Sequence, residues 1–172
     1  DTSFSTITTF GEDVHKIKLL SNGKFYVATG EYVFATQTST IAELRRYNSN
    51  GSIDSSFTTV SYNNSVNDID IQSDEKIIVV GTFTTVSGAT QNRVVRLNTN
   101  GTKDTTFNLG TGPNYHVYKV IVGPSDEILI GGGFGQYNGA PNWGIKMLNP
   151  NGTENAFFNP GHGLPGSVYS LM

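Results

Sequence analysis

Short apolar runs separated by polar turns recur along the chain. The runs at residues 25–28, 77–80 and 128–130 contain only aliphatic and aromatic side chains. Unbroken apolar runs, unlike alternating ones, are typical of strands that are buried on both faces of a sheet. Asn-Gly pairs favour tight hairpins, because the turn needs positive φ. They begin at Asn22, Asn50, Asn100, Asn138 and Asn151. The pattern therefore predicts buried strands joined by tight turns.

The whole pattern repeats at intervals that the closing phenylalanines define. Phe4, Phe57, Phe107 and Phe158 each end a copy of one motif, and their separations are 53, 50 and 51 residues. From Val66 to Phe107 the second unit aligns with the third at a constant offset of 51 without a gap. This period is typical of β-propeller blades. A solenoid or an extended β-sandwich array is the alternative, although solenoid repeats are usually shorter, at about 20 to 30 residues.

The fold class predicted is all-β, with propeller blades of about four antiparallel strands each. In the second unit the strands are expected at residues 66–72, 77–83, 93–97 and 102–107. Residues 41–47 contain helix-forming side chains, yet they align with the third strand of the second unit. Position in the repeat outweighs propensity, so we predict a strand there as well.

Three full blades are expected, with partial blades at each end. Residues 1–4 would be the last strand of a preceding blade and 159–172 the first strand of a following one; the full blades would span 5–57, 58–107 and 108–158. Closed propellers need about four to eight blades. We therefore expect an open segment of a larger propeller, completed by other segments of a longer chain or by further copies.

Residues 77–83, followed by the run RVVRLNTNGTKDTTF at 93–107, resemble the delta-sixty β-propeller repeat of bacterial and phage-associated proteins. Residues 128–134 and 148–158 of the third unit are similar to the same pattern. The resemblance implies a propeller within a large secreted, cell-surface or virion protein, and it brings no catalytic residues. The third unit departs from the pattern because Asn155 stands where the other units have Asp54 and Asp104.

Composition narrows the functional classes. The formal charge is −3 and no basic run is present, which argues against nucleic-acid binding. No apolar run approaches the roughly 18 residues that span a bilayer, so membrane insertion is not expected. The absence of cysteine removes thiolate catalysis and cysteine-ligated zinc.

Candidate chemistry is sparse, and we expect neither a cofactor nor a metal site that the repeat shares. The glycines at 131–135 lack the strand-to-helix context of a phosphate loop. His15, His116 and His162 do not occupy one repeated position. Calcium near Asp68 and Asp70 stays open for one blade only, because lysine or isoleucine stands at the corresponding positions of the other units.

The loop at residues 136–143 is the least repetitive part of the chain. Tyr137, Asn142 and Trp143 are the ligand-contact candidates, since exposed aromatic side chains beside amides suit carbohydrate or protein recognition. The alternative is that Trp143 packs against a neighbouring blade. We predict a non-enzymatic structural and recognition module, extracellular, on a cell surface or in a virion, such as a phage tail or fibre component. A propeller hydrolase or lyase acting on polysaccharide is the alternative.

Overall fold

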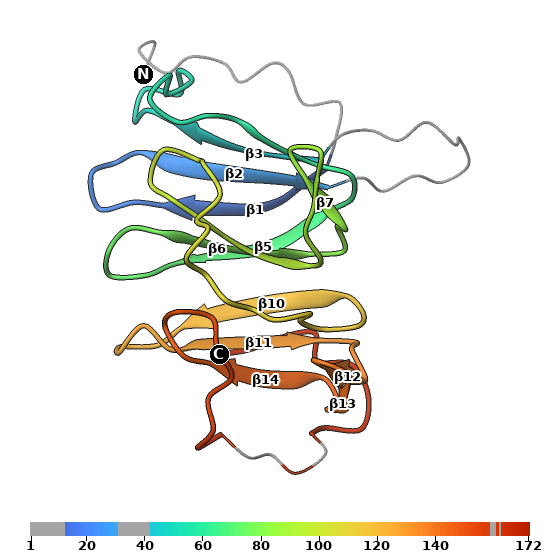
Figure 1. Ribbon diagram of the computed structural model, residues 1–172. Coiled ribbons are helices and arrows are strands. Elements are labelled where there is room, and N and C mark those ends of the chain that lie inside the picture. Colours follow the sequence, from blue (N-terminus) through green and yellow to red (C-terminus); the bar gives the residue numbers. More distant parts are fainter. Residues whose placement is uncertain (1–12, 31–41, 159–160, 162) are drawn as a thin grey trace.

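Residues 13–30, 42–158, 161 and 163–172 are described by the computed structural model (Figure 1). The predicted strand at residues 1–4 and His162 lie outside the described residues. The described elements are all strands, which confirms the all-β class. None of the described segments is a helix that could cross a membrane.

Each repeat unit contributes three antiparallel strands to a sheet; the sheets of the second and third units have three strands, and that of the first is extended to six by three short strands that follow. The first contains β1 (Asp13–Leu19), β2 (Phe25–Gly30) and β3 (Ala42–Tyr47). The second contains β5 (Val66–Ile71), β6 (Ile77–Gly81) and β9 (Val94–Leu97). The third contains β10 (Val117–Val122), β11 (Ile128–Gly132) and β14 (Ile145–Leu148). The strand predicted at residues 41–47 against local helix propensity is therefore confirmed as β3.

The fourth strand expected at residues 102–107 is wrong in its extent. Only one bridge, Leu97↔Lys103, continues the second sheet, and Tyr47↔Ile53 and Leu148↔Glu154 do the same in the other units. Beyond the bridge the chain turns, because the Asp104 carboxylate accepts the N–H of Thr106. A side chain that bonds to nearby backbone competes with the strand ladder.

Short hairpins connect the units at one end. β4 (Val60–Tyr62) pairs with β3 of the first sheet, and it also contacts the hairpin of β7 (Thr85–Val86) and β8 (Ala89–Thr90). The third unit repeats this hairpin as β12 (Gln136–Tyr137) and β13 (Ala140–Pro141). A bridge joins it to the preceding segment at Pro113↔Tyr137.

The three sheets follow one another in space in the order of the sequence (Figure 1). Their first strands are neighbours, since β5 lies against β1 and also against β10. The side chains of β6 alternate between two hydrophobic clusters: Ile77 and Val79 face the first unit, and Ile78 and Val80 face the third. This division explains why the apolar run of β6 is unbroken and confirms the predicted burial on both faces.

Candidate functional site

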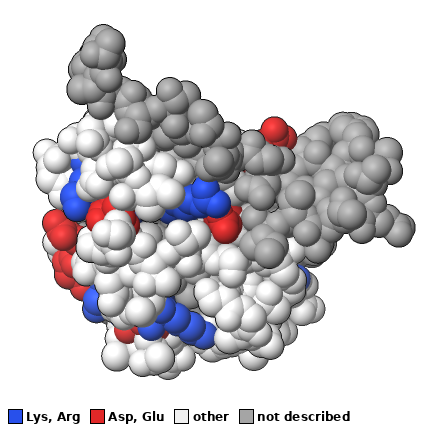
Figure 2. All heavy atoms as spheres, turned by 90° about the horizontal axis from the view of Figure 1, so that it is seen from above, with Lys and Arg blue, Asp and Glu red and all other residues white. Residues whose placement is uncertain are grey.

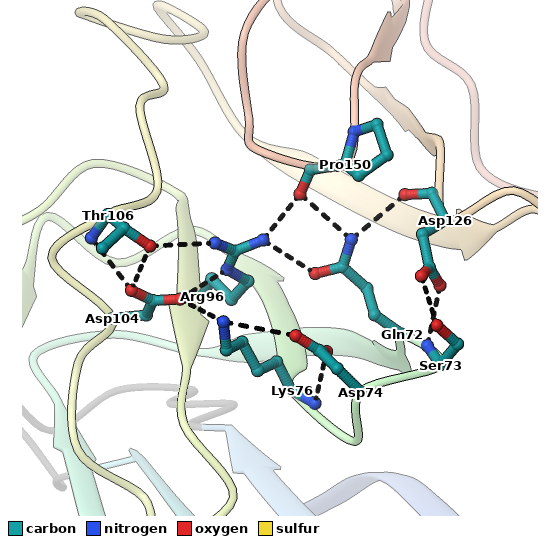
Figure 3. A network of polar contacts seen from close by, with 9 residues as sticks. All are labelled: Gln72, Ser73, Asp74, Lys76, Arg96, Asp104, Thr106, Asp126 and Pro150. Carbon is teal, nitrogen blue, oxygen red and sulfur yellow. Dashed lines mark hydrogen bonds and ion pairs between the residues drawn. The ribbon is translucent and has the colours of Figure 1, made fainter.

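The charged residues of the repeated motif form a joint between consecutive units (Figure 3). Arg96 of β9 lies with its Nε 2.9 Å from Oδ2 of Asp104, and Lys76 approaches the same oxygen at 3.2 Å. Arg96 Nη1 donates to the Pro150 carbonyl at 2.6 Å and to Gln72 Oε1 at 3.0 Å. Because Pro150 belongs to the turn that follows β14, Arg96 ties the second unit to the third.

The first unit builds the same joint with its own residues. Arg46 Nε lies 2.7 Å from Asp54 Oδ2, which also accepts from Lys24 at 2.8 Å. Arg46 Nη1 donates to the Thr99 carbonyl, in the turn of the second unit, at 2.7 Å. We call this set of Arg, Asp and Lys the joint node. It recurs in the first and second units, and in both the arginine donates to a backbone carbonyl of the following unit.

Hydrogen bonds keep the joint carboxylates ionised. The Lys24 hydrogen bond contributes most to lowering the pKa of Asp54, ahead of the opposing effect of burial and the bonds from Ser56. Burial raises the pKa of Asp104, but the hydroxyl and N–H of Thr106 and the Lys76 ammonium outweigh burial. Both pKa values lie well below the usual aspartate range, so both groups are anions at neutral pH.

The closing phenylalanines complete the joint by packing. The Arg96 guanidinium lies 4.7 Å from the ring centre of Phe107, and Arg46 lies 5.1 Å from that of Phe57. Phe57 also lies against Gly101, in the Asn-Gly turn of the next unit, where φ is +88° and a Cβ would come within 2.4 Å of the Thr58 carbonyl. Glycine is needed at this turn for its conformation and for the close approach.

Carboxylates also join the first strands of the three sheets. Asp68 lies 2.7 Å from Lys16 and 3.8 Å from Lys119. Asp70 lies 2.7 Å from Lys18 and accepts the N–H of Val122, on the neighbouring strand, at 2.8 Å. These bonds satisfy donors at a strand edge, which are otherwise a liability. A calcium ion at Asp68 and Asp70 would have to displace the lysines, and no group of three or more His, Asp or Glu side chains in the described ranges could hold a metal.

The structure separates the three ligand-contact candidates. The expectation that Tyr137 is exposed is wrong: its side chain is 1% exposed, and its hydroxyl donates to the Leu109 carbonyl at 3.3 Å. Asn142 is buried too, and its Oδ1 has no hydrogen-bond partner. Trp143 is 50% exposed beside a pocket of about 320 Å³ whose other lining residues are Gly163, Pro165 and Gly166. Among the three candidates, Trp143 is the side chain that solvent reaches.

Residues 20–57, 72–107 and 123–153 match the model of a family described as "Domain of unknown function (DUF5122) beta-propeller". The chain belongs to this β-propeller family. Each matched segment begins directly after the first strand of a unit, includes the unit's second and third strands, and ends in or near the turn that carries the joint. Neither the curated proteins nor the solved structures contain a match.

In this propeller segment the third blade has changed its joint node as a set. At the offset of 51, Met147 stands for Arg96, Asn155 for Asp104 and Glu127 for Lys76. Asn155 still accepts the N–H of Phe157 at 2.9 Å, so the turn survives without the charges. A separate ion pair, Lys146 with Glu154 at 2.6 Å, lies nearby.

An aromatic cluster that the sequence analysis did not single out lies where β10 begins. Tyr115 and His116 stack with their ring centres 3.9 Å apart, and Tyr118 stacks on Tyr169 at 5.1 Å. The aligned positions of the second blade hold Asn64, Ser65 and Asn67. That contrast between aligned positions was the available sequence signal. The histidines do not share a role: His15 Nδ1 lies 3.1 Å from the Val66 carbonyl, whereas His116 stacks on Tyr115.

The charged side chains of the propeller are interspersed. Viewed from the side on which β3 lies, Lys and Arg side chains lie close to Asp and Glu side chains over the described part of that face (Figure 2). On that face, interspersed charge of this kind does not create the single-sign field that steers a nucleic acid to a protein surface.

Proposed function

We propose that this propeller segment is a non-enzymatic structural and recognition module of a larger extracellular, cell-surface or virion protein. In this proposal the shared residues of the blades form the scaffold, and residues that only one blade carries bind a partner. One contrast carries the proposal. The side chains of the joint nodes already form ion pairs and hydrogen bonds within the protein, whereas Trp143 is half exposed beside an apolar pocket.

The biological context is proposed from the resemblance to the delta-sixty type of repeat. The motif RVVRLNTNGTKDTTF at 93–107 supports an origin in bacteria or their phages, for example in a phage tail or fibre. Polar loops rich in Asn, Ser and Thr are compatible with such an exposed location.

The proposed partner is a surface glycan or a protein receptor. A tryptophan ring offers a flat apolar face together with an N–H donor, a combination that is common in recognition surfaces. The pocket beside Trp143 is shallow and its lining is mainly apolar, which suits the C–H face of a sugar ring or an apolar side chain.

Further blades or further copies are proposed to complete the ring. Strand β1 has exposed apolar side chains, namely Val14, Ile17 and Leu19. The first strands of the other two units, β5 and β10, instead contact each other. An exposed apolar strand of this kind is normally covered. We propose that another blade covers it.

The hydrolase form of the enzymatic alternative normally requires two carboxyl groups that face one substrate. Asp54, Asp68 and Asp104 instead each lie within ion-pair distance of lysine or arginine. These ion pairs favour the structural role over polysaccharide hydrolysis.

A glycan array with wild-type protein and Trp143→Asn tests the proposal. Asparagine is the residue at the aligned position of the second blade, Asn92, so the variant should fold. We expect at least about a tenfold loss of glycan binding with an unchanged melting temperature. Tyr137→Phe is the control, because it removes only a buried hydroxyl and should leave binding intact.

Unchanged binding by Trp143→Asn would overturn the role given to Trp143. Cleavage of a bound polysaccharide, seen as new chain ends in the incubation mixture, would favour the enzymatic alternative instead.

A further inference from the structure

Arg93 occupies a left-handed backbone conformation in which the third blade has a glycine. Its φ is +58°, and Gly144, at the aligned position of the third blade, has a φ of +69°. The backbone bonds correspond: Arg93 donates its N–H to the Phe83 carbonyl as Gly144 does to that of Phe134. A bulky residue in this region is strained, and strained residues concentrate at functional sites. The fold itself therefore gives no reason for an arginine here.

The Arg93 side chain is partly buried, and its guanidinium has few hydrogen-bond partners. Its Nε is buried without a hydrogen-bond partner, and Nη1 donates to the Pro113 carbonyl at 3.3 Å. No ion pair joins Arg93 to an acidic residue in the part of the chain that the structure describes. Burial lowers the pKa of Arg93, but arginine stays charged at any physiological pH. Arg93 is therefore a partly exposed cation that no acidic side chain of the described residues neutralises, and such a group can bind an external anion.

An aromatic cluster begins next to this cation: Tyr115 lies close enough to Arg93 to affect its pKa. Tyr169 belongs to the same cluster through Tyr118, whose ring centre lies 6.3 Å from that of His116. Tyr115 is 49% exposed and Tyr169 is 69% exposed, and each stacks on a second ring, His116 and Tyr118 respectively. Burial, and then the charge of Arg93, lower the pKa of His116, so that His116 is neutral at pH 7. The surface therefore offers one positive group and flat apolar faces.

A short chain segment connects this surface with the pocket at Trp143. Residues 163–169 link the two: Leu164 donates its N–H to the Trp143 carbonyl at 2.9 Å, and Val168 donates to that of Gly132 at 2.9 Å. Tyr169 follows directly. A ligand several rings long could contact both ends of this segment.

We propose that Arg93, Tyr115 and Tyr169 bind a carboxylate-bearing sugar of an acidic polysaccharide. The guanidinium donates two parallel N–H hydrogen bonds to the carboxylate, and the tyrosines stack on the sugar ring. One cation among aromatic rings suits one carboxylate on each bound sugar, whereas a nucleic-acid backbone is recognised by many basic groups. The inference rests on the proposed glycan recognition and names its chemical class.

Calorimetric titration with trigalacturonate and with sialyllactose tests the charge requirement. The neutral counterparts are the methyl ester of trigalacturonate and lactose. We expect at least one acidic sugar to bind about tenfold or more tightly than its neutral counterpart. Arg93→Gly should abolish this preference with an equal or higher melting temperature, because glycine is the native residue at the aligned position. Tyr115→Asn, taken from Asn64 of the second blade, should weaken binding while retaining the preference.

The other outcomes separate this inference from the proposed function. Equal affinity for acidic and neutral sugars, or a preference that survives Arg93→Gly, overturns the inference and leaves glycan recognition standing if Trp143→Asn still abolishes binding. Absence of binding to both acidic probes overturns the inference directly. Absence of any glycan binding on the array overturns glycan recognition as well.

Discussion

The joint of the second blade and the corresponding turn of the third blade have the same position in the repeat but different side chains. In the second blade Arg96, Asp104 and Lys76 form an ion-pair node that reaches the next turn. In the third, Met147 and Asn155 stand for the first two, and the turn keeps its hydrogen bond without charges. Removing one member of a buried ion pair leaves the other as an uncompensated charge, which destabilises the fold. The comparison therefore teaches that the node is a unit, kept or replaced as a set.

The same two blades differ in what they expose. The third blade carries Trp143, Tyr115 and His116 where the second has Asn92, Asn64 and Ser65. The third blade thus combines a joint that lacks the arginine–aspartate pair with an aromatic surface, and the second combines a joint that has this pair with polar loops. Shared residues serve the scaffold, and unshared ones are the place to look for recognition.

The largest effect is expected from the packing half of the joint. Phe57→Ala should lower the free energy of unfolding by about 3 kcal/mol, because it empties a buried site between two blades. Phe157→Ala is the matched control, since that ring is 99% exposed, and should change stability by less than about 0.5 kcal/mol. Chemical denaturation of both variants measures the difference. Equal effects would show that the closing phenylalanine does not join the blades.

Acid should distinguish the joint that has the arginine–aspartate pair from the one that lacks it. The pKa of Asp104 is lowered in the folded state, so the unfolded chain takes up a proton first as the pH falls. The contribution of Asp104 is complete above its unfolded pKa, near 4, and is lost as the pH falls towards the folded value. Between pH 4 and 2, the stability of Asp104→Asn should therefore fall less steeply than that of the wild type, by up to about 1.4 kcal/mol per pH unit. Parallel stability curves would contradict this account.

Much of the fold could be predicted because three copies of the repeat can be aligned. A segment whose own sequence is compatible with helix or strand can then be assigned from the corresponding segments of the other copies. The strand β3 was predicted against its helix propensity from alignment alone, and the unbroken run of β6 predicted burial on both faces. The short fourth strand could not be predicted in the same way. The length of this strand depends on whether the Asp104 carboxylate accepts the N–H of Thr106 within the turn. If it does, that N–H cannot pair with a neighbouring strand.

The candidate site was harder to predict because loop packing is a tertiary property. Tyr137 has a polar hydroxyl and is compatible with a surface position. In the structure it lies in the hydrophobic cluster of the third unit, and its hydroxyl donates to the Leu109 carbonyl. Arg93 gave one signal, its alignment with Gly144, but the positive φ that makes this alignment informative is seen only in the structure.

A double-mutant cycle on Arg96 and Asp104 tests the central claim that the joint node acts as a unit. The variants Arg96→Met, Asp104→Asn and their combination install the residues of the third blade in the second. The free energy of unfolding, measured by urea denaturation at pH 7, should fall in each single variant. The double variant should lose less than the two single losses added together, with a coupling free energy of about 1 kcal/mol or more. Strictly additive losses would contradict the claim.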